Sequence, residues 1–222
     1  LAFHDSPDVD DKSREYPPPP PPIYKYMQAG FWLFRDANWS PDFPTTAQVA
    51  AHLYQLGQRL QVDGVIGADD HLARELILAL GPIELEAFGL TVTSSNVTTV
   101  LEEGLADIGR TDLKGIPPRK FLLKVLAENL RHRIQSGLGA EDLGRIGRTL
   151  LWGLEEKHLL LYLPGTKSQE LLAQENLDGS LRSGEGDYLY VVDSNIGYNK
   201  IYHNIEQSIR YEVSWDENGK AK

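Results

Sequence analysis

The sequence contains no cysteine in its 222 residues. This absence excludes disulfide bonds, thiolate metal sites and catalytic thiols. The sequence also lacks an apolar run close to the ~20 residues that a membrane-spanning helix needs. Residues 1–22 have neither the charged start nor the apolar centre of a signal peptide. We therefore expect any membrane anchor to lie upstream of Leu1.

Positive charge is also scarce, because 22 lysines and arginines stand against 32 acidic residues and give a formal net charge of −10. Nucleic-acid binding needs a concentrated cationic surface, so a nucleic-acid partner is not expected. The acidic surplus is explained by solubility alone. A hydrophobic content of 41% is close to the average for globular proteins and predicts a folded chain.

Familiar catalytic motifs are missing from the sequence: there is no Walker loop, no G-x-S-x-G, no H-E-x-x-H and no calcium loop. The histidines are scattered without metal-ligand spacing, and we interpret them as surface or packing residues. They are His4, His52, His71, His132, His158 and His203.

The chain divides by composition near residue 23. Residues 1–22 form an acidic tail that ends in six prolines, Pro17 to Pro22. Six prolines favour an extended polyproline II segment of about 19 Å, at roughly 3.1 Å per residue. We interpret residues 1–22 as a tail and stiff linker, and residues 23–222 as a single domain that lacks an upstream part.

Apolar residues recur at helical spacing in six stretches of this domain. The expected helices cover residues 45–60, 72–80, 97–105, 121–134, 143–154 and 169–175. Thr45, with Gln48 three residues later, resembles a capping box, and Asp69 resembles an N-cap. Gly81 and Pro82 should end the second helix.

Short apolar runs predict strands between these helices. The expected strands cover residues 31–34, 62–68, 83–85, 158–163, 187–193 and 208–215. The strand, helix and strand between residues 62 and 85 resemble a crossover unit. We therefore predict an α/β fold: a layered α/β/α domain with a mixed sheet and an antiparallel C-terminal strand pair.

The loop from Arg35 to Asp42 is the first candidate site. Its arginine offers a planar fork to phosphate or carboxylate, and the carboxylates of Asp36 and Asp42 could orient a hydroxyl or hold a hard cation. Arg119 and Lys120 open a helix and could meet a phosphate there. A purely structural role is favoured, with an Arg35–Asp36 ion pair and aspartate turns that pin the loop.

The run Asp69-Asp70-His71 is the second candidate, as a metal cluster. Neighbouring residues on a helix point in different directions, and capping already gives Asp69 a sufficient role. We favour the cap.

Several segments together resemble the bacterial family known as domain of unknown function 4012, over about residues 24–213. The resembling stretches are residues 34–45, 62–69, 81–82, 119–122, 156–159, 186–189 and 193–200. The resemblance implies a membrane-anchored protein whose folded part lies outside the cytoplasm of a bacterium.

The chain is also distantly similar to the LytR-CpsA-Psr phosphotransferases, which transfer polyprenyl-phosphate-linked glycans to the bacterial wall. In that family an Arg-Asp pair follows a strand, and a later arginine precedes a Phe-Leu helix, as Arg35, Asp36 and Arg119 do here. The similarity implies that Arg35 and Arg119 bind pyrophosphate and that Asp36 assists magnesium or a hydroxyl. The upstream acidic motif that completes the magnesium site of that family is absent from this sequence.

Two functions remain open from the sequence. The favoured one is a noncatalytic, extracytoplasmic interaction domain of the cell envelope that needs no cofactor. Its partners would be other envelope or surface proteins or cell-wall glycan. The alternative is a magnesium-dependent phosphotransferase that acts on polyprenyl-pyrophosphate-linked glycans, with the residues named above in its site.

Overall fold

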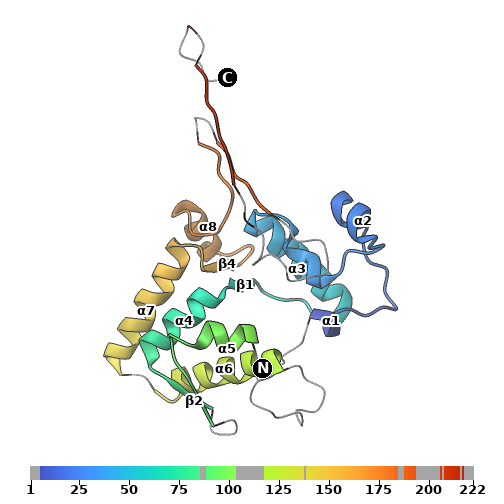
Figure 1. The fold of residues 1–222 in the computed structure, drawn as a ribbon. Helices are drawn as coiled ribbons and strands as arrows, with labels where there is room; N and C mark the ends of the chain where they lie inside the picture. Colours follow the sequence, from blue (N-terminus) through green and yellow to red (C-terminus); the bar gives the residue numbers. More distant parts are fainter. Residues whose placement is uncertain are drawn as a thin grey trace.

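The computed structural model describes residues 6–85, 89–103, 118–137, 139–184, 188–193, 206, 208–215 and 217. In chain order the elements are α1 (Ser6–Val9), α2 (Pro21–Met27), the 3-10 helix η1 (Phe34–Trp39), α3 (Phe43–Gln58), β1 (Val65–Ala68), α4 (Asp70–Leu80), β2 (Ile83–Leu85), β3 (Leu90–Val92), α5 (Val97–Glu103), α6 (Pro118–Gln135), α7 (Ala140–Glu155), β4 (Leu159–Tyr162) and α8 (Lys167–Gln174). Helices and strands are combined in an α/β fold, as predicted (Figure 1). Among the described helices, none is both long and apolar enough to cross a membrane.

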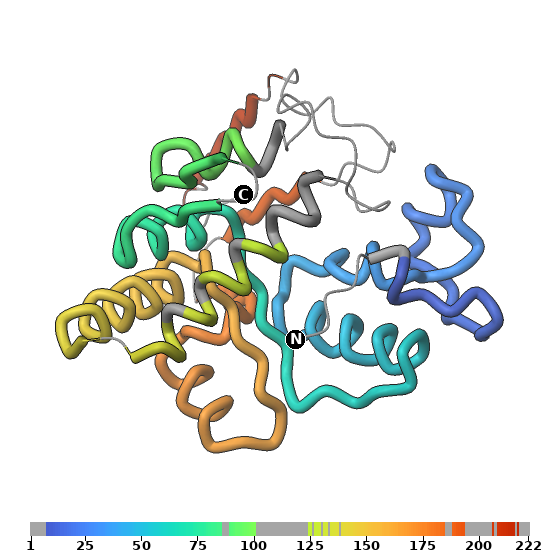
Figure 2. The backbone as a smooth tube through the Cα atoms, turned by 90° about the horizontal axis from the view of Figure 1, so that it is seen from below, coloured from blue at the N-terminus to red at the C-terminus, as the bar shows by residue number. Residues whose placement is uncertain are grey.

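The strands β1 and β4 form an antiparallel pair between two groups of helices. On one face, Phe43 of α3 lies so close to Gly67 that a Cβ there would come within 2.9 Å of the phenyl ring. On the other face, Leu159 packs near Gly153 of α7 and Leu72 of α4. Seen from below, the blue and cyan N-terminal elements lie on one side and the gold α7 on the other (Figure 2). The predicted layering of helices around a sheet is therefore present.

The sheet itself differs from the mixed sheet that we predicted. The assigned strands form two separate antiparallel pairs, β1 with β4 and β2 with β3. Only the four residues 86–89 separate β2 from β3, and so short a connection favours a hairpin. Because β2 pairs with its neighbour in sequence, it does not return beside β1, and the predicted crossover unit is wrong.

The hairpin β2–β3 lies over the first of two core clusters. Ile77, Ile83, Leu85, Val92 and Val97 are buried together, between α4, the hairpin and α5. Burial of such a side chain stabilises the fold by about 1.5–3 kcal/mol. Gly81, with φ of +87°, ends α4 as predicted, because its positive φ is readily adopted only by glycine.

The N-terminal segment packs on the fold where the sequence predicted a tail. Val9 is 3% exposed, and Tyr16 belongs to the second core cluster with Ala37 and Leu53. The side-chain amide of Gln58 donates hydrogen bonds to the carbonyl oxygens of Asp8 and Val9, at 3.0 and 2.9 Å. Two buried apolar side chains and these hydrogen bonds therefore hold the segment against α3.

The proline run also differs from the expected spacer. Pro20, with φ −49° and ψ 142°, has the polyproline II conformation, but Pro21 begins α2, where proline is tolerated because the first helical N–H groups need no partner. The Pro17 carbonyl accepts a hydrogen bond of 2.9 Å from the Trp32 amide. Part of the proline run is thereby tied to the folded domain.

The predicted strand at residues 31–34 is wrong. Phe31 is 59% exposed, and Phe34 begins the 3-10 helix η1. Its amide donates to the Asp10 carboxylate at 3.0 Å, and the Trp32 indole donates to the Asp36 carbonyl at 2.9 Å. Partners other than a neighbouring strand therefore satisfy these polar groups.

The antiparallel C-terminal strand pair is not formed by the described residues. Residues 188–193 and 208–214 carry no strand pattern, and Trp215 makes an isolated bridge. These segments extend away from the helices (Figure 1). Their apolar side chains are exposed, and a two-stranded ribbon whose apolar side chains stay exposed is marginal.

Candidate functional site

The loop that the sequence singled out begins with an ion pair. Arg35 Nε lies 3.4 Å from Asp36 Oδ2, and the Asp36 side chain is only 18% exposed. Asp36 also continues the hydrogen bonding of the loop, since its amide donates to the Leu33 carbonyl at 3.0 Å. The structural role that we favoured for Arg35 and Asp36 is therefore present in the loop.

Asp42, the other acid of this loop, caps α3. Its Oδ2 accepts the Thr45 amide at 3.0 Å and the Thr45 hydroxyl at 2.5 Å, while its Oδ1 accepts the Leu181 amide at 2.9 Å. Partial desolvation raises the pKa of Asp42, but these hydrogen bonds outweigh it and lower the pKa below its usual value. The predicted N-cap at Thr45 is wrong. The N-cap of α3 is Asp42, three residues earlier, and the Thr45 amide donates to its carboxylate.

The second cationic pair, Arg119 and Lys120, lies in the first turn of α6. The side chains of both residues fall outside what the structure describes. The pyrophosphate site expected at Arg35 and Arg119 therefore stays a prediction, as does a phosphate site at this helix start. The magnesium ligands expected at Asp36 and Asp42 both have other partners, an arginine in one case and three hydrogen-bond donors in the other.

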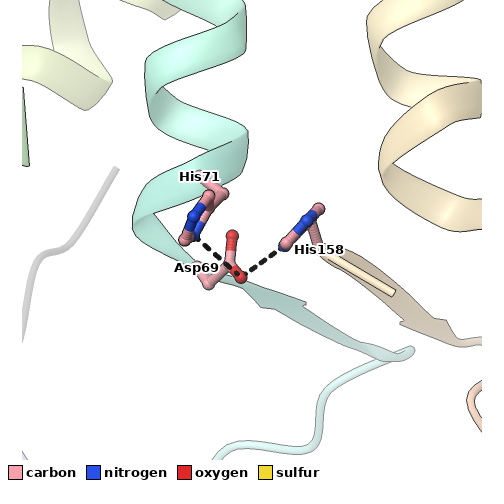
Figure 3. A group of neighbouring side chains, drawn as sticks. All are labelled: Asp69, His71 and His158. Atoms are coloured by element: carbon pink, nitrogen blue, oxygen red, sulfur yellow. Dashed lines mark hydrogen bonds and ion pairs between the residues drawn. The ribbon is translucent and has the colours of Figure 1, made fainter. Parts of the chain in front are cut away.

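A different group of side chains converges at the end of β1. Asp69, His71 and His158 offer ligand atoms that all lie within 4.8 Å of one another (Figure 3). The antiparallel register explains the meeting, since Ala68 pairs with Leu159 and the next residues along are Asp69 and His158. Their backbones touch, with the Asp69 amide donating to the His158 carbonyl at 3.3 Å.

Each carboxylate oxygen of Asp69 has its own partner. Oδ1 accepts the Leu72 amide at 3.0 Å and so caps α4, which confirms the predicted N-cap. Oδ2 lies 2.7 Å from Nδ1 of His158 and 3.9 Å from Nδ1 of His71. Partial desolvation raises the pKa of Asp69, but the hydrogen bonds from His158 and Leu72 and the nearby imidazoles outweigh it and lower the pKa.

Aromatic rings fix the position of His158. Its imidazole stacks on the indole of Trp152 from α7, with 4.9 Å between ring centroids, and on the ring of His71 at the same distance. The His158 side chain is 25% exposed and that of His71 is 61% exposed. The cluster therefore has a fixed inner imidazole and an outer one open to solvent.

Sequence reasoning found part of this cluster and missed the rest. The run Asp69-Asp70-His71 suggests a metal cluster in the sequence, but His158, 87 positions beyond His71, is interpreted there as a surface or packing residue. A signal was present, because Asp69 directly follows one expected strand and His158 begins another. Only antiparallel pairing of those two strands places the residues opposite each other.

Comparison with protein families matches residues 2–105 to the family described as protein of unknown function (DUF4012). This match confirms the resemblance carried by residues 34–45, 62–69 and 81–82. The match includes the N-terminal segment that packs on α3, and the resembling stretches after residue 105 lie beyond it. No curated protein and no solved structure matches the chain.

Proposed function

We propose that this chain, whose residues 2–105 belong to the DUF4012 family, is a noncatalytic interaction domain of the bacterial cell envelope, located outside the cytoplasm. The observation that carries the proposal is a row of exposed apolar side chains on the C-terminal segment, which we call the arm: residues 188–193 and 208–215. The envelope location rests on the family resemblance.

Within the arm, residues 208–215 have the side-chain pattern of a strand that is covered on one face. Apolar residues alternate with polar ones, and every apolar side chain in the alternation is at least 40% exposed. The apolar set is Ile209, Tyr211, Val213 and Trp215. On the other side, Arg210 and Glu212 form an ion pair. A row of exposed apolar side chains of this size is typical of a protein-binding surface.

The chemistry of the arm favours a partner protein that supplies a strand. An extended segment offers backbone donors and acceptors to a neighbouring strand. Burial of its apolar face against the partner adds favourable free energy of binding. Tyrosine and tryptophan, both present here, are enriched where protein interfaces are buried. The net charge of −10 opposes association between two copies of the chain and so favours a different protein as partner.

The phosphotransferase alternative has less support from the loop geometry. Its magnesium ligands would be Asp36 and Asp42, and Asp36 lies against Arg35 while both oxygens of Asp42 accept hydrogen bonds. Magnesium binding there would have to break contacts that hold η1 and α3. A noncatalytic role needs no such rearrangement.

Site-specific photocrosslinking on the surface of intact cells tests the proposal. A photoreactive phenylalanine analogue at Tyr211 or Val213 should give one crosslinked product of defined mass. The same analogue at Glu212 should give much less, because that side chain lies on the opposite side of the arm. Equal crosslinking from both faces, or a product with the mass of two copies of the chain, would overturn the proposal.

A ligand titration separates this role from the enzymatic one. Magnesium together with a polyprenyl pyrophosphate analogue should leave the melting temperature of the chain unchanged. A ligand that binds only the native state must raise it, by an amount that grows with ligand concentration. A rise that disappears in Arg35→Ala would support the phosphotransferase.

A further inference from the structure

We propose that Asp69, His71 and His158 form a binding site for a divalent transition-metal ion of the zinc type. The site is independent of the arm and of the loop from Arg35 to Asp42. It would join the start of α4 to the start of β4, two segments that are far apart in the sequence.

The donor set is the first argument. Two imidazoles and one carboxylate bind Zn²⁺ in many proteins, and a fourth position is then left for water or a substrate. Magnesium and calcium prefer oxygen ligands, so they match this set poorly. Among the residues that the structure describes, Asp69, His71 and His158 are the group of histidine, cysteine or acidic residues whose ligand atoms converge.

The second argument is that the ligands are already oriented. The Leu72 amide holds Asp69 Oδ1, which leaves Oδ2 directed at the two histidines (Figure 3). The stacking of His158 on Trp152 limits the rotation of that imidazole. Contacts behind the ligands that fix their orientation are typical of metal sites and contribute to affinity.

Only small movements separate the present geometry from a bound one. Ligand atoms around a tetrahedral zinc ion lie about 3.3 Å apart, given bonds of about 2.0–2.1 Å. Asp69 Oδ2 and His158 Nδ1 are now 2.7 Å apart and would separate slightly, and the imidazole of His158 would carry its proton on Nε2 so that Nδ1 is free to bind the metal. His71 Nδ1, now 3.9 Å from Asp69 Oδ2, would approach, and its 61% exposure leaves it room to move.

Local charge also favours a cation. Asp70 Oδ1 lies 3.6 Å from His71 Nδ1 and adds a second carboxylate beside the site. The start of α4 carries a partial positive charge of about half a unit, which opposes cation binding. The two carboxylates carry more negative charge than this partial positive charge, so the net local charge attracts a cation.

The test uses the tag-free full chain, stripped with a chelator, and zinc chloride alone as the probe. Calorimetry should give one zinc per chain, and Co²⁺ should give the absorption bands of a tetrahedral site. At a hundredfold excess over Kd, zinc should raise the melting temperature by roughly 5–10 °C, because it binds the native state only. Magnesium should leave the melting temperature unchanged.

Two variants separate metal binding from folding. Asp69→Asn keeps a good N-cap for α4 but removes the anionic ligand, and His71→Ala removes the most exposed ligand. Each should weaken zinc binding at least about tenfold while the chelated protein stays folded. His52→Ala, an exposed histidine on α3, is the matched control and should bind zinc like the unchanged chain. Zinc affinity that is unchanged in His71→Ala and Asp69→Asn, or equally reduced in His52→Ala, would overturn the proposal.

Discussion

Asp69 and His158, 89 residues apart in the chain, lie opposite each other one step beyond the paired strands, with Asp69 Oδ2 2.7 Å from His158 Nδ1. The same carboxylate caps α4 through its other oxygen. One side chain thus joins the start of a helix to the start of a strand. Removal of Asp69 should therefore affect both local and long-range contacts.

Substitution of Asp69 should separate its capping role from its charge. Asp69→Ala should lower the free energy of unfolding by about 0.5–2 kcal/mol, because the Leu72 amide loses its acceptor. Asp69→Asn should lower the free energy of unfolding by only a few tenths of about 1 kcal/mol, since asparagine caps a helix as well as aspartate does. Urea unfolding at pH 7 in the presence of a chelator measures both. Equal losses in the two variants would contradict the capping role.

The charge of Asp69 should appear in the pH dependence of stability. Its pKa is lower in the folded chain than in the unfolded one, so its contribution is present above about pH 4 and is lost as the pH falls through the folded value. The difference in stability between the unchanged chain and Asp69→Asn should therefore shrink below about pH 4. The other carboxyls contribute equally to both proteins and cancel. A difference that grows in acid would contradict the lowered pKa.

Gly57 should tolerate no larger side chain, because the N-terminal segment lies against it. A Cβ at this position would lie 1.9 Å from the carbonyl oxygen of Val9. Alanine favours a helix over glycine by about 1 kcal/mol, but displacement of the segment should cost more and give a net loss of about 1–3 kcal/mol. Thermal unfolding of Gly57→Ala measures this loss.

The matched control is Gly147→Ala in α7, where a Cβ would meet nothing within 4 Å. That variant should be more stable by up to about 1 kcal/mol. If Gly57→Ala were stabilised by the same amount, the N-terminal segment would not be packed on α3.

Asp42 should be more important for stability than an ordinary surface carboxylate. Asp42→Ala removes the cap of α3 and the acceptor of the Leu181 amide, 139 residues away. We expect a loss of about 1–2 kcal/mol in urea unfolding. The exposed Asp63, replaced by alanine, should change stability by less than about 0.5 kcal/mol. Similar values for the two variants would contradict the double role of Asp42.

The arm should contribute little to the stability of the isolated chain. Ile209 and Tyr211 are 60% and 53% exposed, so their replacement by serine should change the free energy of unfolding by less than about 0.5 kcal/mol. Replacement of the buried Ile77 by alanine should cost about 2–5 kcal/mol. A large loss from the arm variants would mean that the arm packs on its own chain, which would remove the basis for a partner.

Local patterns in the sequence determined most of the helices and their ends. The periodic apolar residues of α4 and α7, the cap at Asp69 and the stop at Gly81 all act within a few residues of themselves, so they can be predicted without a fold. The short strands β2 and β4 were predicted for the same reason. Errors arose where a residue has a distant partner: Val9 and Tyr16 bury against α3, and Asp42 accepts the Leu181 amide.

Strand pairing and the histidine cluster were decided only by the tertiary structure. Alternating and apolar runs predict that strands exist, but they carry no information on which strand lies beside which. The antiparallel pairing of β1 with β4 brings His158 to Asp69 and His71, and the same sequence with parallel pairing would separate them. The residue types in the cluster were therefore visible in the sequence, and their distance from one another depended on the fold.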